Sequence, residues 1–452
     1  MVKLFGTDGV RGLANSVLTP ETAFALGRAG AFVLTKESAS PRVIIGTDTR
    51  VSCGMLKAAL AAGLCSAGAD VFSAGVITTP AVAGLTRKQG FDAGVMISAS
   101  HNPFYDNGIK FFDRNGFKLS DELENEIEAL ISKGLEGVPR AEGEKIGRIM
   151  EYETALDDYL ALIKPALGDL SLSGLKIALD CSNGAAYEAA PLLFYELGAS
   201  VFVINNEPDG TNINRACGST QPAGLAEFVK ETGADVGFAF DGDCDRIIAA
   251  DENGNIVDGD MMLLILAKRL KSEGRLVRDT VVGTVMSNLG FLNGCRENGI
   301  TAEITKVGDR YVLEKMMEKG YNLGGEDSGH IIFLDYGTTG DGILAAAQIA
   351  KIMKSSGKRL SELNALKKFP QVLVNARVPH DKKDDYLTNP KIRAGIRALE
   401  DKYASAGRVL IRPSGTEPLV RVMIEGGDLE AITGDARELA GYIEELYQRS
   451  YI

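Results

Sequence analysis

Residues 43–73 read Val43-Ile-Ile-Gly-Thr-Asp-Thr-Arg-Val-Ser-Cys-Gly-Met-Leu-Lys-Ala-Ala-Leu-Ala-Ala-Gly-Leu-Cys-Ser-Ala-Gly-Ala-Asp-Val-Phe-Ser73. The apolar run 43–45 suits a strand. Leu56, Leu60 and Leu64 follow at four-residue spacing, which is typical of a helix. The run 70–73 is again strand-like. A strand, a helix and a strand in succession predict a β-α-β unit of an α/β protein.

The same order of elements recurs twice along the chain. The second copy consists of the strand-like 175–180, the helical 185–197 and the extended 201–204, and the third of 280–284, 289–298 and 301–305. We therefore expect three α/β units in series.

The last part of the chain has a different pattern and predicts a smaller α+β domain. Its expected strands are 371–378 and 419–424, and its expected helix is 435–447, with Leu439, Ile443 and Leu446 facing inward. A glycine- and charge-rich segment, 134–147, precedes an expected helix at 151–163 and marks the first boundary. The expected domains are 1–153, 154–255, 256–369 and 370–452.

The composition excludes several classes of protein. Of 452 residues, 45% are hydrophobic and 24% are charged, and no stretch is long and apolar enough to predict a membrane span. The first residues lack the apolar core of a signal peptide, and the six cysteines form no Cys-x-x-Cys pair, so we expect a cytoplasmic protein with reduced thiols. The net charge of −12 argues against a general nucleic-acid binder.

A reactive hydroxyl is indicated by Ile97-Ser-Ala-Ser-His-Asn-Pro-Phe-Tyr-Asp-Asn-Gly-Ile-Lys110, which follows the apolar run 93–97. Asn102, Pro103, Asn107 and Gly108 suit turns, so this stretch is expected to be a polar loop that exposes Ser100. Taken alone, it would more often be a structural corner.

A metal site is indicated by Asp241-Gly-Asp-Cys-Asp-Arg246 at the end of the strand-like run 236–240. Three crowded carboxylates need a cation, and hard oxygen ligands suit Mg²⁺ or Ca²⁺. The sequence does not fit an EF-hand calcium loop, because Arg246 stands where the sharp turn requires glycine and the flanking segments look like strands.

Two further loops carry groups that bind polar ligands. Gly324-Gly-Glu-Asp-Ser-Gly-His330 offers carboxylates, a hydroxyl and an imidazole to a polyol, and could equally be a polar turn before a strand. Arg412-Pro-Ser-Gly-Thr-Glu-Pro418, with Arg421 downstream, has the composition of a phosphate cradle or of a surface turn. No Walker loop is found.

In this order and spacing, the loops resemble those of the α-D-phosphohexomutase superfamily over the whole chain. The resemblance implies four domains around a central cleft, three with related α/β mixed sheets and a smaller C-terminal α+β domain. The stretches 5–12, 97–110, 208–214 and 217–220 are most similar to members that interconvert glucosamine 6-phosphate and glucosamine 1-phosphate. Those isomerases supply UDP-N-acetylglucosamine synthesis.

The resemblance also implies roles for particular residues. It assigns phosphoryl transfer to Ser100, His101, Lys110, Arg11 and Arg246, metal binding to Ser100, Asp241, Asp243 and Asp245, and substrate binding to Glu326, Ser328, His330, Arg412, Ser414, Gly415, Thr416 and Arg421. Ser100 would be a phosphoserine, with one Mg²⁺ per chain and a hexose 1,6-bisphosphate as activator. The expected partners are a small sugar phosphate and a second copy of the chain in a homodimer.

Three alternatives stay open. The same fold could act on glucose or mannose phosphates, since Asp327 stands where these glucosamine-specific members usually have glutamine. A Mg²⁺-dependent sugar phosphatase would share Ser100 and the aspartates but would transfer the phosphoryl group to water. A non-catalytic metal- or sugar-binding protein would not be phosphorylated at Ser100.

Overall fold

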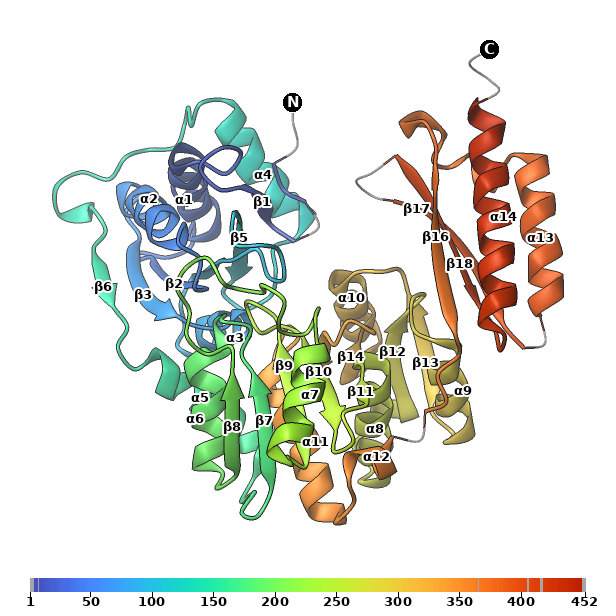
Figure 1. The fold of residues 1–452 in the computed structure, drawn as a ribbon. Coiled ribbons are helices and arrows are strands. Elements are labelled where there is room, and N and C mark those ends of the chain that lie inside the picture. The colour runs from blue at the N-terminus through green and yellow to red at the C-terminus, as the bar shows by residue number, and fades with distance from the viewer. Residues whose placement is uncertain (1–3, 7, 365, 405, 415–417, 449–452) are drawn as a thin grey trace. The chain divides into compact units, whose positions relative to one another are not determined.

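The computed structural model describes residues 4–6, 8–364, 366–404, 406–414 and 418–448. It divides into two compact units, which are described separately. The first unit comprises residues 1–286 and 298–365, and the second comprises residues 287–297 and 366–452. Three mixed α/β sheets belong to the first unit, and one antiparallel sheet belongs to the second (Figure 1).

The first domain is built on a six-stranded sheet. Its elements are β1 (Val10–Leu13), α1 (Pro20–Leu34), β2 (Arg42–Thr47), α2 (Cys53–Ser66), β3 (Asp70–Val76), α3 (Thr79–Lys88), β4 (Ala93–Ile97), β5 (Asp106–Asp113), α4 (Asp121–Ser132), the 3₁₀ helix η1 (Gly143–Lys145) and β6 (Ile149–Glu151). The strand order is β1-β5-β4-β2-β3-β6, in which β5 is antiparallel to both of its neighbours. The apolar faces of α1 and α2 pack on each other and on this sheet in one core.

The second domain has a five-stranded sheet in the order β11-β10-β9-β7-β8. Its elements are α5 (Ala155–Leu167), β7 (Lys176–Asp180), α6 (Ala186–Glu196), β8 (Ser200–Ile204), α7 (Ala223–Thr232), β9 (Val236–Phe240), β10 (Ile247–Asp251) and β11 (Ile256–Val257). Strands β8, β7 and β9 are parallel, and β10 is antiparallel to β9. The parallel strands are buried apolar runs, as expected for a sheet covered by helices.

The third sheet has four strands in the order β13-β12-β14-β15. The elements around it are α8 (Gly259–Ser272), the 3₁₀ helix η2 (Val277–Asp279), β12 (Thr280–Thr284), β13 (Thr301–Thr305), α10 (Asp309–Lys319), β14 (Leu323–Gly325), β15 (Ile331–Phe333), α11 (Gly342–Ser356) and α12 (Leu360–Leu363). Strands β13, β12 and β14 are parallel, and β15 is antiparallel to β14. The three expected α/β units are therefore present, except that the helix expected at 289–298 in the third, observed as Leu289–Glu297, groups with the second compact unit.

The second unit contains a three-stranded antiparallel sheet in the order β16-β18-β17. Its elements are α9 (Leu289–Glu297), β16 (Gln371–Arg377), the 3₁₀ helices η3 (His380–Lys382) and η4 (Asp385–Leu387), α13 (Pro390–Tyr403), β17 (Arg408–Pro413), β18 (Leu419–Glu425) and α14 (Leu429–Gln448). Helix α14 packs on β16 and β18 around an apolar core. Asn288, which immediately precedes α9, connects that helix to β18, since its Nδ2 donates to Glu425 Oε1 at 3.2 Å.

Several expected boundaries are wrong. The helix expected at 151–163 begins only at Ala155, because Glu151 belongs to β6 and pairs with Ser73 of β3. The helix expected at 435–447 begins at Leu429. Asn107 and Gly108, expected in a turn, lie in β5, where a Cβ on Gly108 would lie 2.5 Å from the Ser98 carbonyl oxygen.

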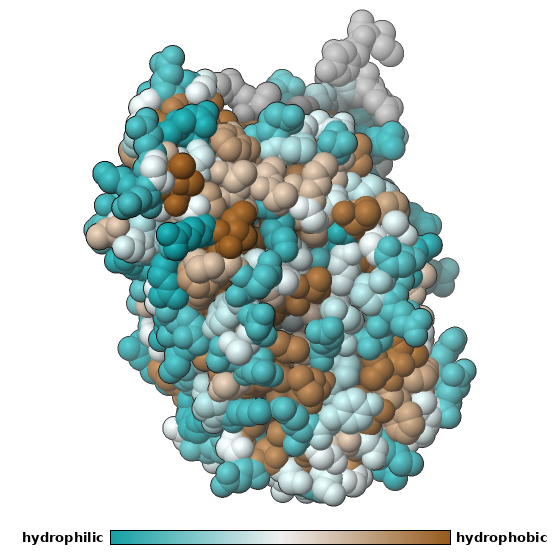
Figure 2. All heavy atoms as spheres, turned by 90° about the vertical axis from the view of Figure 1, so that its left-hand side faces the viewer, coloured by the Kyte–Doolittle hydropathy of each residue, from teal (hydrophilic) through white to brown (hydrophobic). Residues whose placement is uncertain are grey.

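The surface is consistent with the composition. The face shown in Figure 2 carries mostly hydrophilic side chains, and its hydrophobic side chains form small separate groups. Among the described residues, no helix combines the length and the apolar character that crossing a bilayer requires. All six cysteines are buried, and none forms a disulfide within the described part of the chain.

Asp341 provides a pH-dependent test of the fold, because its buried carboxylate caps α11. Its Oδ1 accepts hydrogen bonds from the Leu344 N–H at 2.9 Å and from the Tyr159 hydroxyl at 3.0 Å. Burial raises the pKa of Asp341 from 3.8 to about 6, despite these bonds to the charged form. The folded state therefore holds this proton more tightly than the unfolded state. The resulting stabilisation, about 3 kcal/mol, is present below pH 4 and is lost as the pH rises through 6.

We expect Asp341→Asn, which keeps the capping oxygen, to be more stable than the wild type at pH 7.5. The advantage should shrink as the pH falls to 5, because the wild-type carboxyl then becomes neutral. Thermal midpoints measured across this range check the prediction. Asp258→Asn, at the N-cap of α8, controls for replacing a capping aspartate. Parallel pH profiles of wild type and Asp341→Asn would contradict it.

Candidate active site

Three loops occupy equivalent places in the three α/β sheets. Each follows the parallel strand that borders the antiparallel strand, so that β4 leads to β5, β9 to β10 and β14 to β15. These loops carry Ser100, residues 241–245 and residues 326–330. Since ligand groups in α/β proteins gather at the carboxyl ends of parallel strands, the topology explains why loops so distant in sequence meet.

Ser100 presents its hydroxyl to a carboxylate of the second domain. Its backbone is left-handed, with φ of 51°, and the residue is 1% exposed. Ser100 Oγ donates to Asp241 Oδ2 at 2.6 Å and lies 3.3 Å from His101 Nδ1. A left-handed backbone costs a non-glycine residue about 1 kcal/mol or more and persists only where neighbours hold it. The hydroxyl is thus fixed beside the aspartate cluster.

The aspartate cluster has the geometry of a cation site. One oxygen from each of Asp241, Asp243 and Asp245 lies within 4.8 Å of the others, and all three residues are buried. Asp243 Oδ1 and Asp245 Oδ1 accept no hydrogen bond from the residues that the structure describes. Burial raises the pKa of Asp241, and the charges of Asp245 and Asp243 raise it further. A hard divalent cation would relieve this repulsion and fill the open oxygen positions.

Positive groups surround the serine and the aspartates. Lys110, 1% exposed on β5, places Nζ 2.8 Å from Asp243 Oδ2 and 3.0 Å from Asp8 Oδ2. Burial opposes its charge, but these two carboxylates outweigh burial and raise the pKa of Lys110. Arg11 and Arg246 each bury an Nε–H that has no hydrogen-bond partner among the described residues. Unsatisfied guanidinium N–H groups beside a serine are suited to an incoming phosphoryl oxygen.

His101 is held neutral in this environment. Burial, followed by the charges of Arg246 and Arg11, lowers the pKa of His101 from 6.5 to about 4. Its Nδ1 lies 3.4 Å from Arg246 Nη1. At neutral pH the imidazole can therefore accept a proton or a hydrogen bond.

Three residues that the sequence did not single out complete a closed ring through all three domains, in which carboxylates alternate with two lysines and an imidazole. The members in order are Asp8, Lys110, Asp245, His330, Asp309 and Lys118, which returns to Asp8. Lys118 Nζ lies 2.5 Å from Asp8 Oδ1 and 2.5 Å from Asp309 Oδ2. Burial opposes the charge of Lys118, but Asp309 and Asp8 raise its pKa. Lys118 and Asp309 had no recognisable local pattern, because Lys118 meets Asp8 and Asp309 across 110 and 191 positions of the chain.

The loop at 326–330 brings two expected ligand groups close to this ring. Glu326 is buried, and its Oε1 accepts the Gly308 N–H at 3.0 Å. Ser328 Oγ is buried and makes no hydrogen bond within the described part of the chain. His330 lies between Asp245 and Asp309, at 3.7 Å from each, and its Nε2 accepts the Gly340 N–H at 3.0 Å.

The expected phosphate cradle lies in the second unit. Arg412 and Arg421 are paired residues on the neighbouring strands β17 and β18. Ser414 is buried, and its carbonyl accepts a hydrogen bond from Lys383 Nζ at 2.8 Å. Gly415 and Thr416 lie outside the described residues. The two guanidinium groups therefore come from adjacent positions of one sheet.

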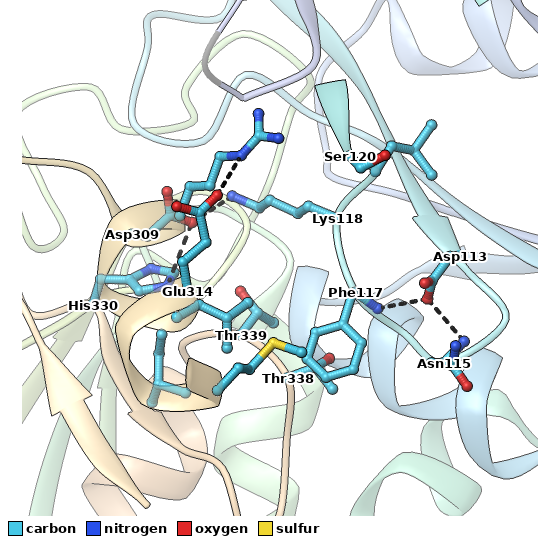
Figure 3. A pocket seen from close by; sticks show the side chains of 15 residues that line it. Asp113, Asn115, Phe117, Lys118, Ser120, Asp309, Glu314, His330, Thr338 and Thr339 are labelled. Carbon is cyan, nitrogen blue, oxygen red and sulfur yellow. Dashed lines mark hydrogen bonds and ion pairs between the residues drawn. The ribbon is translucent and has the colours of Figure 1, made fainter. Parts of the chain in front are cut away.

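A cavity of about 350 Å³ lies on one side of Lys118 (Figure 3). Lys118, Asp309 and His330 line it together with the apolar side chains of Phe117, Leu313, Met317 and Ile332. In Figure 3, Lys118 extends from the first domain toward Asp309. This lysine is thus a charged contact between two domains at the edge of the site.

We expect Lys118→Met to lower the free energy of unfolding by about 2 kcal/mol, because Asp8 and Asp309 would both lose a partly buried cation. Urea unfolding followed by circular dichroism measures the change. Lys36→Met removes an exposed ion pair with Glu126 and should cost less than about 1 kcal/mol. Equal losses in the two variants would show that the Lys118 contacts contribute no more than a surface pair.

Comparison with known proteins gives full-length matches. Sequence models of the phosphoglucomutase/phosphomannomutase family match four segments: alpha/beta/alpha domain I at 2–137, domain II at 157–254, domain III at 258–369 and the C-terminal domain at 373–441. Phosphoglucosamine mutase from Caldicellulosiruptor bescii is 58% identical over 446 residues, which are 98% of this chain and 99% of that protein. Phosphoglucosamine mutase from Clostridium perfringens is 57% identical over 445 residues, with the same coverage.

Solved structures give the same result for the fold. A phosphoglucomutase/phosphomannomutase family protein from Burkholderia thailandensis aligns with a TM-score of 0.80 at 26% identity, covering 98% of each chain. An Aspergillus fumigatus N-acetylphosphoglucosamine mutase in complex with GlcNAc-6P and magnesium aligns with a TM-score of 0.68 over 98% of this chain and 96% of that one. At 18% identity, the second likeness is one of fold.

Proposed function

Because this chain belongs to the phosphoglucomutase/phosphomannomutase family, we propose that it is the isomerase that interconverts glucosamine 6-phosphate and glucosamine 1-phosphate. The identity of 57–58% to phosphoglucosamine mutases over nearly the whole chain supports this substrate. The product would supply UDP-N-acetylglucosamine synthesis in the cytoplasm. The observation that carries the chemistry is the Ser100 hydroxyl, which lies 2.6 Å from Asp241 in a buried aspartate cluster that also binds the Lys110 ammonium group.

The proposed reaction begins with phosphorylated Ser100. The bond between Ser100 Oγ and phosphorus breaks, and a hydroxyl oxygen of the bound sugar phosphate forms the new bond, which gives a bisphosphate. After the sugar turns over, the other phosphoryl group returns to Ser100 Oγ and leaves the isomer. The proton of the attacking hydroxyl has two candidate acceptors, the imidazoles of His101 and His330. A free hexose 1,6-bisphosphate would phosphorylate an unmodified Ser100 and so act as activator.

The residues of this chain would supply charge and position. Lys110, Arg11 and Arg246 would bind the moving phosphoryl group, which carries negative charge on its equatorial oxygens. One Mg²⁺ held by Asp241, Asp243, Asp245 and Ser100 would neutralise part of that charge. Glu326, Ser328 and His330 would bind sugar hydroxyls common to both orientations, and Arg412, Ser414, Gly415, Thr416 and Arg421 would hold the phosphate that is not reacting. The proposed domains are 1–153, 154–255, 256–369 and 370–452.

Asp327 is the residue we propose as a determinant of sugar choice. Its carboxylate would lie near the 2-substituent and favour an ammonium group over a hydroxyl through a charge-assisted contact. Asp327→Gln, assayed on glucosamine and glucose phosphates, should lower the preference for glucosamine. An unchanged ratio of kcat/KM values would contradict this role.

A homodimer is the proposed assembly. Leu13, Val17 and Tyr105 are 44%, 65% and 51% exposed and lie together, since β1 pairs with β5 and the Ala14 N–H donates to the Tyr105 carbonyl at 2.9 Å. Light scattering after gel filtration tests the assembly, and Val17→Glu should weaken it. A monomer at micromolar concentration would contradict the proposal.

The deciding experiment is a mutase assay with glucosamine, glucose and mannose phosphates, run with Mg²⁺ and the matching bisphosphate. Intact-protein mass follows phosphorylation of Ser100. We expect the highest kcat/KM on glucosamine phosphates. Release of inorganic phosphate without isomer would instead indicate the phosphatase, and a preference for glucose or mannose phosphates would indicate the related mutase.

A further inference from the structure

The loop from Ser98 to Asp106 must keep an unusual shape for the hydroxyl of Ser100 to stay in place. Ser100 within it has a left-handed backbone, and the loop connects the end of β4 to the start of β5. Carbonyl oxygens of such a loop cannot pair within a sheet and require other donors. Four of these carbonyl groups accept hydrogen bonds from one side chain.

Arg50 supplies those donors from the loop after β2. Its Nη2 donates to the carbonyl oxygens of Ser100 and Asn102, both at 2.8 Å. Its Nη1 donates to the carbonyl of Asp106 at 3.0 Å and to that of Pro103. Arg50 is 2% exposed, and with its Nε bonded to Asp48 all five guanidinium N–H groups are used.

Asp48 and Ser98 connect Arg50 to the backbone N–H of Ser100. Asp48 Oδ2 accepts from Arg50 Nε at 2.8 Å and from Ser98 Oγ at 2.6 Å. Ser98 Oγ in turn accepts the Ser100 N–H at 2.9 Å. Both backbone polar groups of Ser100 are therefore tied to one buried network that starts at Arg50.

We infer that Arg50 is a positioning residue for phosphoryl transfer, an inference that rests on the proposed function. Arg50 hydrogen-bonds neither the Ser100 hydroxyl nor the aspartates of the cluster. It acts by holding the backbone of Ser100, so that Oγ stays 2.6 Å from Asp241 Oδ2. Because its bonds are to the loop, its loss should slow the transfer of the phosphoryl group and leave the binding of sugar phosphate nearly unchanged.

The geometry requires arginine in particular. Four carbonyl oxygens spread along the loop are reached by a planar, rigid fork, whereas a lysine offers three donors at one point. Asn214 of the second domain provides partial support, since its Nδ2 donates to the Ser100 carbonyl at 2.8 Å and to that of Asn102 at 3.2 Å. The loop of an Arg50 variant should therefore be loosened rather than lost.

Arg50→Lys tests the inference on the full chain with Mg²⁺ and bisphosphate. We expect kcat to fall about 100-fold, the effect of misplacing reacting groups by about 1 Å, with KM for the sugar phosphate changed less than threefold. In single turnover, phosphorylation of Ser100 by the bisphosphate, followed by intact mass, should slow by the same factor. Arg42→Lys is the matched control, because Arg42 begins β2, the strand that precedes Arg50, but packs on the rings of Phe72 and Phe91.

Chemical rescue separates positioning from folding. In Arg50→Ala, added guanidinium at millimolar concentration should fill the vacated site and raise kcat at least tenfold, with no change for Arg42→Ala. A wild-type kcat in Arg50→Lys would overturn the inference. A fall in kcat that only follows the folded fraction, without rescue, would also overturn it. If the wild type itself showed no mutase activity, the proposed function would fail instead.

Discussion

Replacing Ser100 with alanine is expected to lower kcat/KM for the mutase reaction by at least about 10⁴-fold, because the chain would lose the atom that carries the phosphoryl group. The neighbouring Ser98 hydroxyl cannot take its place, since Ser98 Oγ is engaged by the Ser100 N–H and by Asp48. The variant should also gain no mass on incubation with the bisphosphate. Isomerisation followed by phosphorus NMR, together with intact mass, measures both effects.

Ser182→Ala provides a matched control for Ser100→Ala. Ser182 is buried after β7 of the second domain with φ of 52°, and its Oγ donates to the Cys181 carbonyl at 2.7 Å. Its substitution should change kcat/KM by less than tenfold and leave phosphorylation intact. Activity above one hundredth of wild type in Ser100→Ala would rule out a phosphoserine mechanism at this residue.

The second large effect concerns the aspartate cluster. Removing divalent metal with a chelator should lower activity by about 10³-fold, equivalent to about 4 kcal/mol of transition-state stabilisation, and Mg²⁺ should restore it. Asp241→Asn should remain inactive when Mg²⁺ is added. Thermal unfolding gives a measurement that does not depend on turnover. Mg²⁺ at 100 times its Kd should add about 2.7 kcal/mol to the free energy of unfolding of the wild type and so raise its thermal midpoint.

Without metal, Asp241→Asn should not destabilise the protein. Since burial and the charges of Asp245 and Asp243 raise the pKa of Asp241, its charge opposes folding when no cation is present. In chelator, Asp241→Asn should therefore be at least as stable as the wild type, and Mg²⁺ should add nothing. Asp251→Asn, a buried aspartate in the β10 turn that binds Asn255, is the control and should keep its response to Mg²⁺. An equal response in Asp241→Asn would show that the cluster is not the metal site.

Strands and helices with clear periodicity were predictable. The strands 280–284 and 301–305 were predicted as the structure has them, and the family resemblance is confirmed. Helix α13 and strand β17 of the second unit were missed. Helix α13 has an apolar stripe at helical spacing, Ile392, Ile396, Leu399 and Tyr403, which is typical of an amphipathic helix, so its core face was legible in the local sequence.

The site was predictable where its residues form a compact motif. The Ser100 loop and the aspartate triplet each combine several chemistry-bearing residues within six positions, and the structure brings them together. Lys110 was expected in a turn and lies on β5, which is why its amine reaches the buried aspartates. Arg50 was missed because a single arginine after a strand resembles a surface residue until its partners are known.

By itself, the sequence determined the α/β units and the family, and it singled out Ser100 and the aspartate triplet as candidates, because each depends on residues that are close neighbours in the chain. Only the tertiary structure decided which charges face one another. Lys118 reaches Asp309 across 191 positions, and Ser100 reaches Asp241 across 141. Such contacts follow from the packing of whole sheets, which places equivalent loops at one point. Electrostatic interactions there depend on burial and distance, and no local pattern records either.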